Sequence, residues 1–215
     1  MPTDPHAAQP VLTAGAPLAQ APGALILLHG RGADAADILS LARELGRPDL
    51  AYLAPQAAGS AWYPNRFLMP AASNEPWLSS ALAKVGAVVA QVQAAGLPAE
   101  RTFLLGFSQG ACLALETAAR QPIRYGGVFG LSGALIENGD QPHEYTGDLA
   151  GAPVFLGCSD VDPHIPVERV QRSAGLFESL GAAVTLRLYR NMDHTVNRDE
   201  LRFIRGVLDQ AIPAV

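Results

Sequence analysis

A serine between two glycines is the part of this sequence with the clearest chemistry: residues 106–110 read Gly-Phe-Ser-Gln-Gly. A free serine hydroxyl is a poor nucleophile, and enzymes that use one place it on a sharp strand-to-helix turn, beside a base and backbone donors. An apolar, strand-like run, Thr102–Phe107, precedes Ser108, and a helix-like run, Gln109–Arg120, follows it. The pattern therefore predicts a nucleophile at Ser108 on such a turn.

An acid and a histidine that could activate this serine follow it along the chain. An expected buried strand, 154–157, opens into a loop with Asp160 and Asp162, and His194 follows an expected strand at 183–189. This order of nucleophile, acid and histidine is the one that α/β-hydrolases require. Loops at the carboxyl ends of parallel strands emerge at one edge of a sheet, so the three side chains can meet there. From the residues alone, either aspartate could reach the histidine.

Three other histidines compete with His194 for the role of base, namely His29, His143 and His164. His194 is favoured because it alone lies just ahead of the final helix. His29 ends the first core strand and is expected to brace the turn beside it. His164 is expected to be a pocket or loop residue.

Strand-like and helix-like runs alternate along the chain and predict an α/β fold, with a mostly parallel central sheet and helices on both faces. The expected strands are 24–28, 50–55, 102–107, 125–132, 154–157 and 183–189, and the expected helices are 34–45, 77–95, 109–120, 167–180 and 197–211. Residues 1–20 are expected to form an N-terminal edge hairpin or arm, with its strands within 9–20. No linker divides residues 1–215 and neither irregular stretch is long enough for a large cap domain, so we expect one domain with an open site.

Length and composition narrow the class of protein. With 215 residues, of which 49% are hydrophobic, the chain can form one domain with a sizeable core. The net charge of −5 and the charged fraction of 16% disfavour nucleic acid or an anionic membrane as a partner. No apolar run reaches the ~18 to 20 residues that span a bilayer, and the first residues lack a secretory-signal pattern. We therefore expect a soluble, cytoplasmic protein that acts on a small neutral or modestly polar molecule.

The two cysteines, Cys112 and Cys158, lie at the start of a predicted helix and the end of a predicted strand. They could pair if the fold brought them together. In an intracellular chain, two reduced thiols in the core are the expected state.

Several segments together resemble the phospholipase/carboxylesterase family of α/β-hydrolases, the group that includes acyl-protein thioesterases. They are Leu-His-Gly-Arg-Gly-Ala at 28–33, Ala-Pro-Gln at 54–56, the segment 106–110, Asp-Pro-His-Ile-Pro at 162–166, and His194. Trp-Tyr-Pro at 62–64, with Phe67 and Asn-Glu-Pro at 74–76, is similar to a bacterial branch of predicted esterases. The resemblance spans nearly the whole chain.

The resemblance implies a role for each matching residue. Ser108 would be the nucleophile, Asp162 the acid of the triad and His194 the base. The backbone amides of Arg31 and Gln109 would form the oxyanion hole. The resemblance implies no metal and no organic cofactor, and it makes a homodimer plausible.

Aromatic residues gather in the irregular stretch that ends at Pro76. Trp62, Tyr63 and Phe67 are candidates for the wall of a substrate pocket, and so are Leu135 in the second irregular stretch and His164 beside the candidate acid. The alternative for the aromatic cluster is a small satellite core under a long loop.

These observations lead to an expected function. We expect a serine carboxylesterase that hydrolyses short- to medium-chain carboxylic esters through an acyl-enzyme, a route that also cleaves thioesters. An acyl-protein thioesterase or lysophospholipase is the alternative within enzymes, and it would need an apolar channel for a long chain. A small-ligand-binding homologue without turnover is the alternative from another class, because the fold alone does not guarantee activity.

Overall fold

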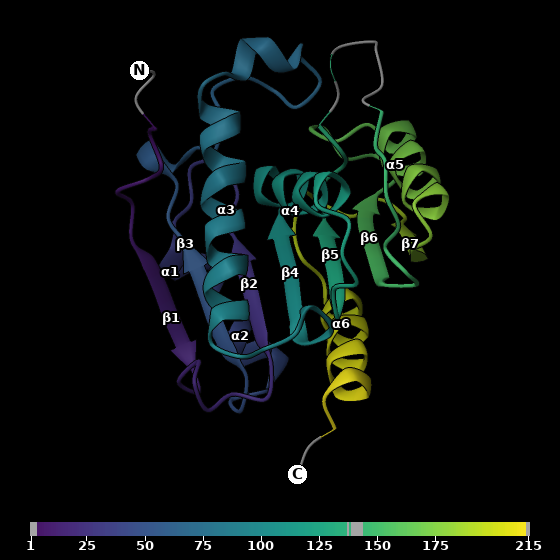
Figure 1. Cartoon of the computed structure of the whole chain (residues 1–215). Coiled ribbons are helices and arrows are strands. Elements are labelled where there is room, and N and C mark those ends of the chain that lie inside the picture. The colour runs from purple at the N-terminus through teal and green to yellow at the C-terminus, as the bar shows by residue number, and fades with distance from the viewer. Residues whose placement is uncertain (1–3, 137, 139–143, 214–215) are drawn as a thin grey trace.

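A twisted sheet lies at the centre of the molecule, with helices on both faces (Figure 1). The computed structural model describes residues 4–136, 138 and 144–213. Within them the strands are β1 (Val11–Gly15), β2 (Ala24–Leu28), β3 (Ala51–Pro55), β4 (Thr102–Phe107), β5 (Gly127–Leu131), β6 (Pro153–Ser159) and β7 (Ala183–Tyr189). The α/β architecture expected from the sequence is confirmed, and no cap domain covers the sheet in the described part of the chain.

The order of the strands creates a crevice beside β2. The sheet runs β1-β3-β2-β4-β5-β6-β7, and every pair is parallel except β1 with β3. The chain builds from β2 toward β3 and then crosses to β4 on the other side. Loops that follow β2 and β4 therefore diverge at their carboxyl ends, which is where open α/β sheets bind ligands.

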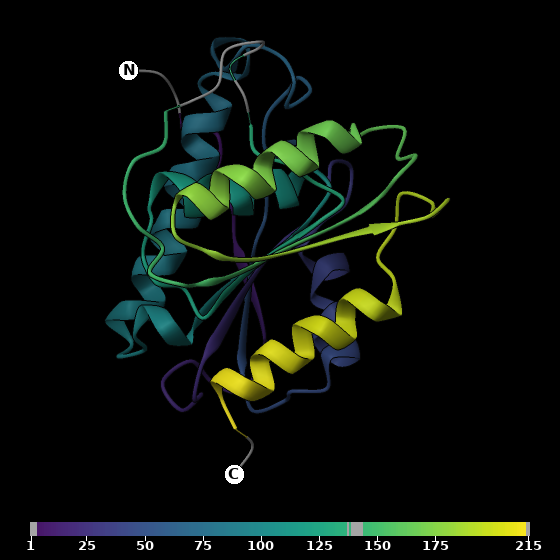
Figure 2. The ribbon, with the colours of Figure 1, turned by 90° about the vertical axis from the view of Figure 1, so that its right-hand side faces the viewer.

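The helices form two layers, one on each face of the sheet (Figure 2). They are α1 (Ala35–Leu39), α2 (Leu41–Leu45), α3 (Trp77–Ala94), α4 (Gln109–Arg120), α5 (Val167–Ser179) and α6 (Arg198–Ala211), with short 3-10 turns η1 (Ala58–Ser60), η2 (Ala71–Asn74) and η3 (Ala99–Arg101). Ile26 and Leu28 belong to the buried apolar cluster that includes side chains of α3, α4 and α5, whereas Leu25 and Leu27 belong to the cluster that includes side chains of α1, α2 and α6. Successive residues of a strand point to opposite faces, so β2 is apolar throughout. Among the described helices, none has both the length and the apolarity needed to cross a bilayer.

Two expected elements take a particular form in the structure. Of the edge hairpin or arm expected over residues 1–20, the described part has one edge strand, β1, and no second strand follows it because Gln20 and Ala21 donate backbone hydrogen bonds to Pro17 and close a turn there. The single helix expected over 34–45 is two short helices that meet at Ser40. Around Ser40 the backbone bonds span three residues, with N–H···O distances of 3.0 Å to Asp37 and 3.1 Å from Arg43.

Helix α4 rests directly on the ends of two strands, and glycines make this approach sterically feasible. A Cβ atom at Gly110 would lie 2.1 Å from the carbonyl oxygen of Leu28 at the end of β2. A Cβ atom at Gly106 would lie 2.1 Å from the carbonyl oxygen of Gly110 itself. Both obstacles are backbone atoms, which cannot rotate away. The two glycines of the segment 106–110 are therefore required by packing.

We expect Gly110→Ala to lower the free energy of unfolding by about 1 to 3 kcal/mol, the usual effect of overpacking a dense core. Gly206→Ala is the matched control, because Gly206 is exposed on the outer face of α6, where an added Cβ atom would meet nothing within 4 Å beyond its own helix. That control should gain about 0.5 to 1 kcal/mol from helix propensity. Urea unfolding measures both variants. A Gly110→Ala protein as stable as the wild type would contradict the packing argument.

Two buried histidines hold the loop that follows β3, and neither is exposed to solvent. His6 Nδ1 accepts the Ala58 N–H at 3.0 Å, and His6 Nε2 lies 2.9 Å from the Trp62 carbonyl oxygen. His29 Nε2 accepts the Ala57 N–H at 3.1 Å, and its Nδ1 lies 2.8 Å from the Gly30 carbonyl oxygen. Each ring has one accepting and one donating nitrogen, which is the pattern of a neutral imidazole.

Burial lowers the pKa of both His6 and His29, against the smaller opposing effects of their carbonyl partners and of nearby Asp4, Asp34 and Asp37. As the pH falls, the unfolded chain therefore binds protons that the folded chain does not. The stabilisation from the neutral rings is complete above the ordinary histidine pKa of about 6.5 and is lost as the pH falls through and below it.

We expect the contribution of the two histidines to the free energy of unfolding to fall as the pH drops below about 6.5, by up to about 1.4 kcal/mol per pH unit for each. Buried Glu200, whose pKa burial raises to about 7, acts in the opposite direction over this range, so the comparison with a histidine variant isolates the effect. Urea titrations across this range test the prediction. His6→Asn removes one of the two groups, so its stability should depend less steeply on pH. A His6→Asn stability that depends on pH as steeply as that of the wild type would contradict the assignment of a neutral His6 ring.

Candidate active site

Ser108 lies at the tip of the turn between β4 and α4. Its backbone angles are φ 54° and ψ −118°, an uncommon conformation for a residue with a side chain. The Ser108 N–H donates to the carbonyl oxygen of Leu131 at 2.9 Å, and the Ser108 carbonyl accepts the N–H of Cys112 at 3.0 Å. The turn is thus fixed to β5 on one side and to the helix on the other, and these bonds stabilise the strained residue.

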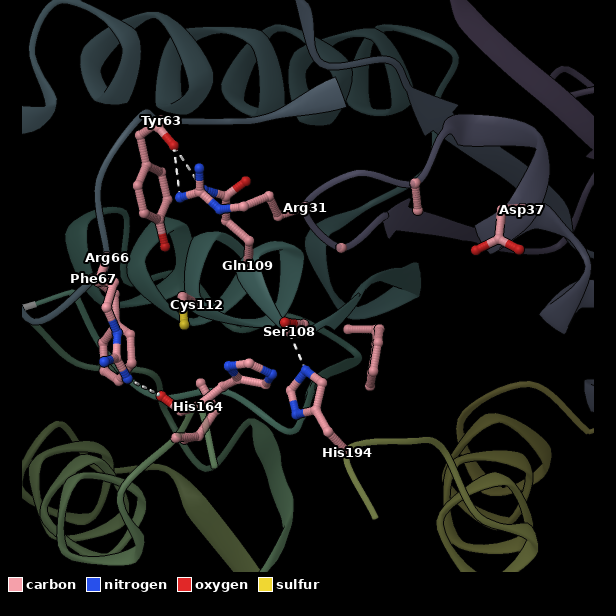
Figure 3. A pocket seen from close by; sticks show the side chains of 14 residues that line it. Arg31, Asp37, Tyr63, Arg66, Phe67, Ser108, Gln109, Cys112, His164 and His194 are labelled. Carbon is pink, nitrogen blue, oxygen red and sulfur yellow. Dashed lines mark hydrogen bonds between the residues drawn. The ribbon is translucent and has the colours of Figure 1, made fainter. Parts of the chain in front are cut away.

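A chain of hydrogen bonds joins three side chains from three separate loops. His194 Nε2 lies 2.9 Å from Ser108 Oγ (Figure 3), and His194 Nδ1 lies 2.7 Å from Asp162 Oδ2. The loops follow β4, β6 and β7, so the sheet brings the expected residues together at its carboxyl edge. With an ionised carboxylate, Nδ1 donates to Asp162 and Nε2 accepts the serine hydroxyl. This is the tautomer in which a histidine can take the proton of a serine.

The environment of Asp162 keeps its carboxylate ionised. Its side chain is fully buried, and its Oδ1 accepts the backbone N–H groups of His164 at 2.8 Å and Ile165 at 3.0 Å. Burial alone would raise the pKa of Asp162, but the hydrogen bonds from His194 and from these two amides outweigh it and the pKa is lowered. The competing residue, Asp160, instead accepts the N–H of Asn191 at 2.8 Å and so braces the loop that leads to His194.

Aromatic rings pack against the His194 imidazole. The Phe107 ring centroid lies 5.0 Å away, and the His164 ring meets His194 edge-on at 4.8 Å. The side chain of His194 is 18% exposed, enough to be reached from the crevice. His29 is buried beside the loop after β3, and His143 lies outside the described residues.

Two backbone N–H groups lie next to the serine. A Cβ atom at Gly30 would lie 3.5 Å from Ser108 Cβ and 3.3 Å from the Phe107 ring, so the chain leaving β2 passes close to the turn. Arg31 comes next, and Gln109 begins α4 on the other side. Within the described ranges, no protein acceptor is found for the backbone N–H of Arg31 or Gln109. The helix dipole of α4 adds partial positive charge near Gln109. The two amides thus suit an anionic oxygen beside Ser108.

A cavity of about 330 Å³ opens beside Ser108. One part of its lining is apolar and deeply buried: Tyr63 and Cys112 are each 1% exposed, and Phe67 is 5% exposed. Figure 3 shows these three side chains on one side of Ser108 and Asp37 on the other. The cavity therefore combines a hydroxyl, an imidazole and two backbone donors with an apolar recess.

The expected pocket residues divide into two groups. Tyr63, Phe67 and His164 line the cavity. Trp62 is instead buried in the core, where its indole N–H donates to the His29 carbonyl at 2.9 Å. Leu135 is 1% exposed and packs in the core, and its backbone N–H donates to Ser173 Oγ. Both apolar side chains gain more from the core than they would at an open cavity wall.

Sequence reasoning did not place Cys112 in the pocket, although its position one helical turn after Ser108 is a signal that could have done so. Cys112 lines the cavity, and burial raises the pKa of its thiol to about 12. Both Cys112 and Cys158 are free, as expected. Nothing in the local sequence reveals the hydrogen-bond partners of the Arg31 and Gln109 side chains. Across the described residues, no cluster of His, Cys, Asp and Glu suits a metal ion.

Comparison with known proteins agrees with this geometry. The family model for phospholipases and carboxylesterases matches residues 13–212. The crystal structure of a phospholipase/carboxylesterase from Dyadobacter fermentans is similar, with a TM-score of 0.90 and 42% sequence identity over 94% of this chain and 96% of that one. The esterase PE8 has a TM-score of 0.75 and 26% identity over 95% of this chain and 98% of its own.

Curated proteins match over a shorter stretch. Acyl-protein thioesterase 1 of Kluyveromyces lactis is 31% identical over 120 residues, which is 54% of this chain and 53% of that protein. A probable carboxylesterase of Arabidopsis thaliana, SOBER1-like, is 25% identical over 137 residues, 64% of this chain and 52% of its own length. The chain thus spans about half the length of the curated relatives that it matches. Because the family match covers nearly all of the sequence, the chain belongs to the phospholipase/carboxylesterase family.

Proposed function

We propose that this protein is a serine carboxylesterase that hydrolyses short- to medium-chain carboxylic esters through an acyl-enzyme. The observation that carries the proposal is the continuous hydrogen-bonded path from Ser108 Oγ through His194 to the buried carboxylate of Asp162. Family membership supports chemistry on ester bonds.

The first half of the reaction forms the acyl-enzyme. Ser108 Oγ attacks the carbonyl carbon of the ester while His194 Nε2 takes the hydroxyl proton, and Asp162 stabilises the resulting imidazolium. The negative charge on the former carbonyl oxygen is stabilised by the backbone N–H groups of Arg31 and Gln109. The bond to the alcohol then breaks, and His194 gives its proton to the leaving oxygen.

The second half regenerates the enzyme. A water molecule takes the place of the alcohol, loses a proton to His194 Nε2 and attacks the acyl carbon. When this tetrahedral intermediate collapses, the proton returns to Ser108 Oγ and the carboxylic acid leaves. A thioester would follow the same steps with a thiol as the leaving group.

The apolar recess supports the choice of chain length. Tyr63, Phe67 and Cys112 line the recess and also belong to the buried core, and the whole cavity measures about 330 Å³. Such a recess suits an acyl group of a few carbons. A long acyl chain would need a channel that continues past these side chains.

Two alternatives remain to be tested against this proposal. An acyl-protein thioesterase is favoured by the likeness to the Kluyveromyces lactis protein of that name. A non-catalytic homologue would bind esters without releasing acid. The homodimer that the family resemblance implies also stays a prediction.

A fluorophosphonate probe should label the wild-type protein and fail to label Ser108→Ala, because only an activated serine displaces fluoride from phosphorus. Ser179→Ala is the control: Ser179 is exposed, and its hydroxyl donates to a carbonyl at the end of α5, away from the cavity. Intact-mass spectrometry measures the adduct. Labelling of folded Ser108→Ala, or none of the wild type, would refute the nucleophile assignment.

The rates on p-nitrophenyl esters from acetate to dodecanoate test the chain length. We expect kcat/KM to fall beyond medium chains, and Phe67→Ala to raise the octanoate-to-acetate ratio of kcat/KM by about tenfold by deepening the apolar recess. Met69→Ala, a nearby residue that is 46% exposed and not part of the cavity lining, should leave the ratio unchanged. A wild-type optimum at long chains would favour the thioesterase or lysophospholipase instead.

A further inference from the structure

Two side chains from distant parts of the sequence meet on one backbone oxygen, the carbonyl of Tyr63. An Nη2–H of Arg31 donates to it at 2.9 Å, and the Nε2–H of Gln109 donates to it at 2.8 Å (Figure 3). Arg31 and Gln109 both line the cavity at Ser108, and their backbone N–H groups are those of the proposed oxyanion hole. One carbonyl is therefore linked to both amides of the proposed oxyanion hole.

Arg31 makes further bonds to the same loop. Its Nη1 donates to the carbonyl of Pro64 at 2.9 Å, and its Nη2 donates to the carbonyl of Asn65 at 2.7 Å. The guanidinium is planar and its donors point in fixed directions, so three carbonyl partners define the orientation of the side chain. Arg31 itself lies between Gly30 and Gly32, and Gly32 has a φ of +81°. A turn flanked by glycines has much backbone freedom, which these bonds reduce.

Gln109, at the start of α4, forms hydrogen bonds to the same loop. Its Oε1 accepts the N–H of Trp62 at 2.8 Å, while its Nε2 donates to Tyr63. Gln109 is only 6% exposed, so water is not available to replace either partner. Glutamate lacks the N–H that the Tyr63 carbonyl needs, and methionine lacks both polar atoms. Of these residues, only glutamine satisfies both groups.

We propose that the side chains of Arg31 and Gln109 are positioning residues that set the two oxyanion amides relative to each other through the loop of residues 62–65. This inference rests on the proposed esterase function. The two amides come from different elements, the turn after β2 and the start of α4. Stabilising one oxygen requires both donors within about 2.7 to 3.1 Å of it. A misplacement of about 1 Å can cost about 10²-fold in rate.

The side chains of Arg31 and Gln109 should differ in how strongly they position the two amides. The bonds of Arg31 to Pro64 and Asn65 are exposed, and water can take over an exposed carbonyl at small cost. The bonds of Gln109 are buried, and their loss leaves two backbone groups without partners. Gln109 is therefore the stronger of the two positioning residues.

The test compares Arg31→Met, Gln109→Met and the double variant with p-nitrophenyl acetate as substrate. We expect kcat to fall about fivefold for Arg31→Met and about 10- to 30-fold for Gln109→Met, with KM within about twofold of the wild type, because the donors act mainly in the transition state. The loss in the double variant should be smaller than the product of the single losses, since both side chains act through the carbonyl of Tyr63. Arg31→Lys should recover part of the loss of Arg31→Met.

Arg101→Met is the matched control. Arg101 is likewise an exposed arginine that donates to a backbone carbonyl, that of Pro22 at 3.1 Å, but it lies in η3 at the opposite end of β4. Its kcat should equal that of the wild type. A second readout is the inhibition constant of a trifluoromethyl ketone, whose adduct with Ser108 carries an oxyanion. This inhibition constant should rise in proportion to the loss of kcat/KM.

The inference is overturned if Arg31→Met and Gln109→Met keep wild-type kcat, or if their losses appear only in KM. Equal losses in Arg101→Met would also overturn it. Thermal midpoints, measured for each variant, separate unfolding from mispositioning, and assays well below the lowest midpoint remove any contribution of unfolded protein. Failure of the esterase proposal would look different, because the wild type itself would then neither hydrolyse the ester nor react with a fluorophosphonate.

Discussion

The turn at Ser108 depends on backbone atoms approaching more closely than side chains allow. The carbonyl oxygen of Leu28 and that of Gly110 occupy the places where the Cβ atoms of residues 110 and 106 would stand. With both side chains absent, α4 begins directly above β2 and β4, and Ser108 takes a positive φ between them. The hydroxyl, the N-terminus of α4 and the end of β2 then lie at one place. The position of every other group in the site is defined relative to this contact.

The sheet supplies the remaining groups from its carboxyl edge. Asp162 follows β6 and His194 follows β7, two strands that are paired along their whole length from Pro153 with Ala183 to Ser159 with Tyr189. The Asp160 bond to Asn191 extends this pairing into the loops themselves. The acid and the base are therefore held by one pair of strands, and Figure 3 shows His194 and Tyr63 on opposite sides of Ser108. Rigid support on both sides is what a preorganised site needs.

Much of this arrangement could be predicted from the sequence because it depends on local patterns. Apolar runs located the core strands, the Gly-x-Ser-x-Gly segment located the turn, and the order of residues pointed to His194. The break at Ser40 could not be foreseen, since the residues around it have ordinary helical spacing and only hydrogen bonds in the folded chain reveal it.

Trp62 and Leu135 were expected at the pocket because their stretches are irregular. Whether an apolar side chain in such a stretch faces a cavity or the core depends on which distant elements pack over it. The partners of the Arg31 and Gln109 side chains depend on long-range contacts for the same reason.

The segment before β1 also supports the loop beside the site. His6 binds the carbonyl of Trp62, and Gln109 binds the N–H of the same residue, so a single tryptophan connects the amino-terminal side of the chain to the start of α4. The carboxyl-terminal side, beyond α6, emerges at the other pole of the molecule (Figure 1). The two sides are therefore not equivalent for protein engineering. A fusion partner, an affinity tag or a surface attachment joined upstream of His6 would lie close to the residues that support the site, whereas one joined after Ile212 would lie at the far pole of the molecule.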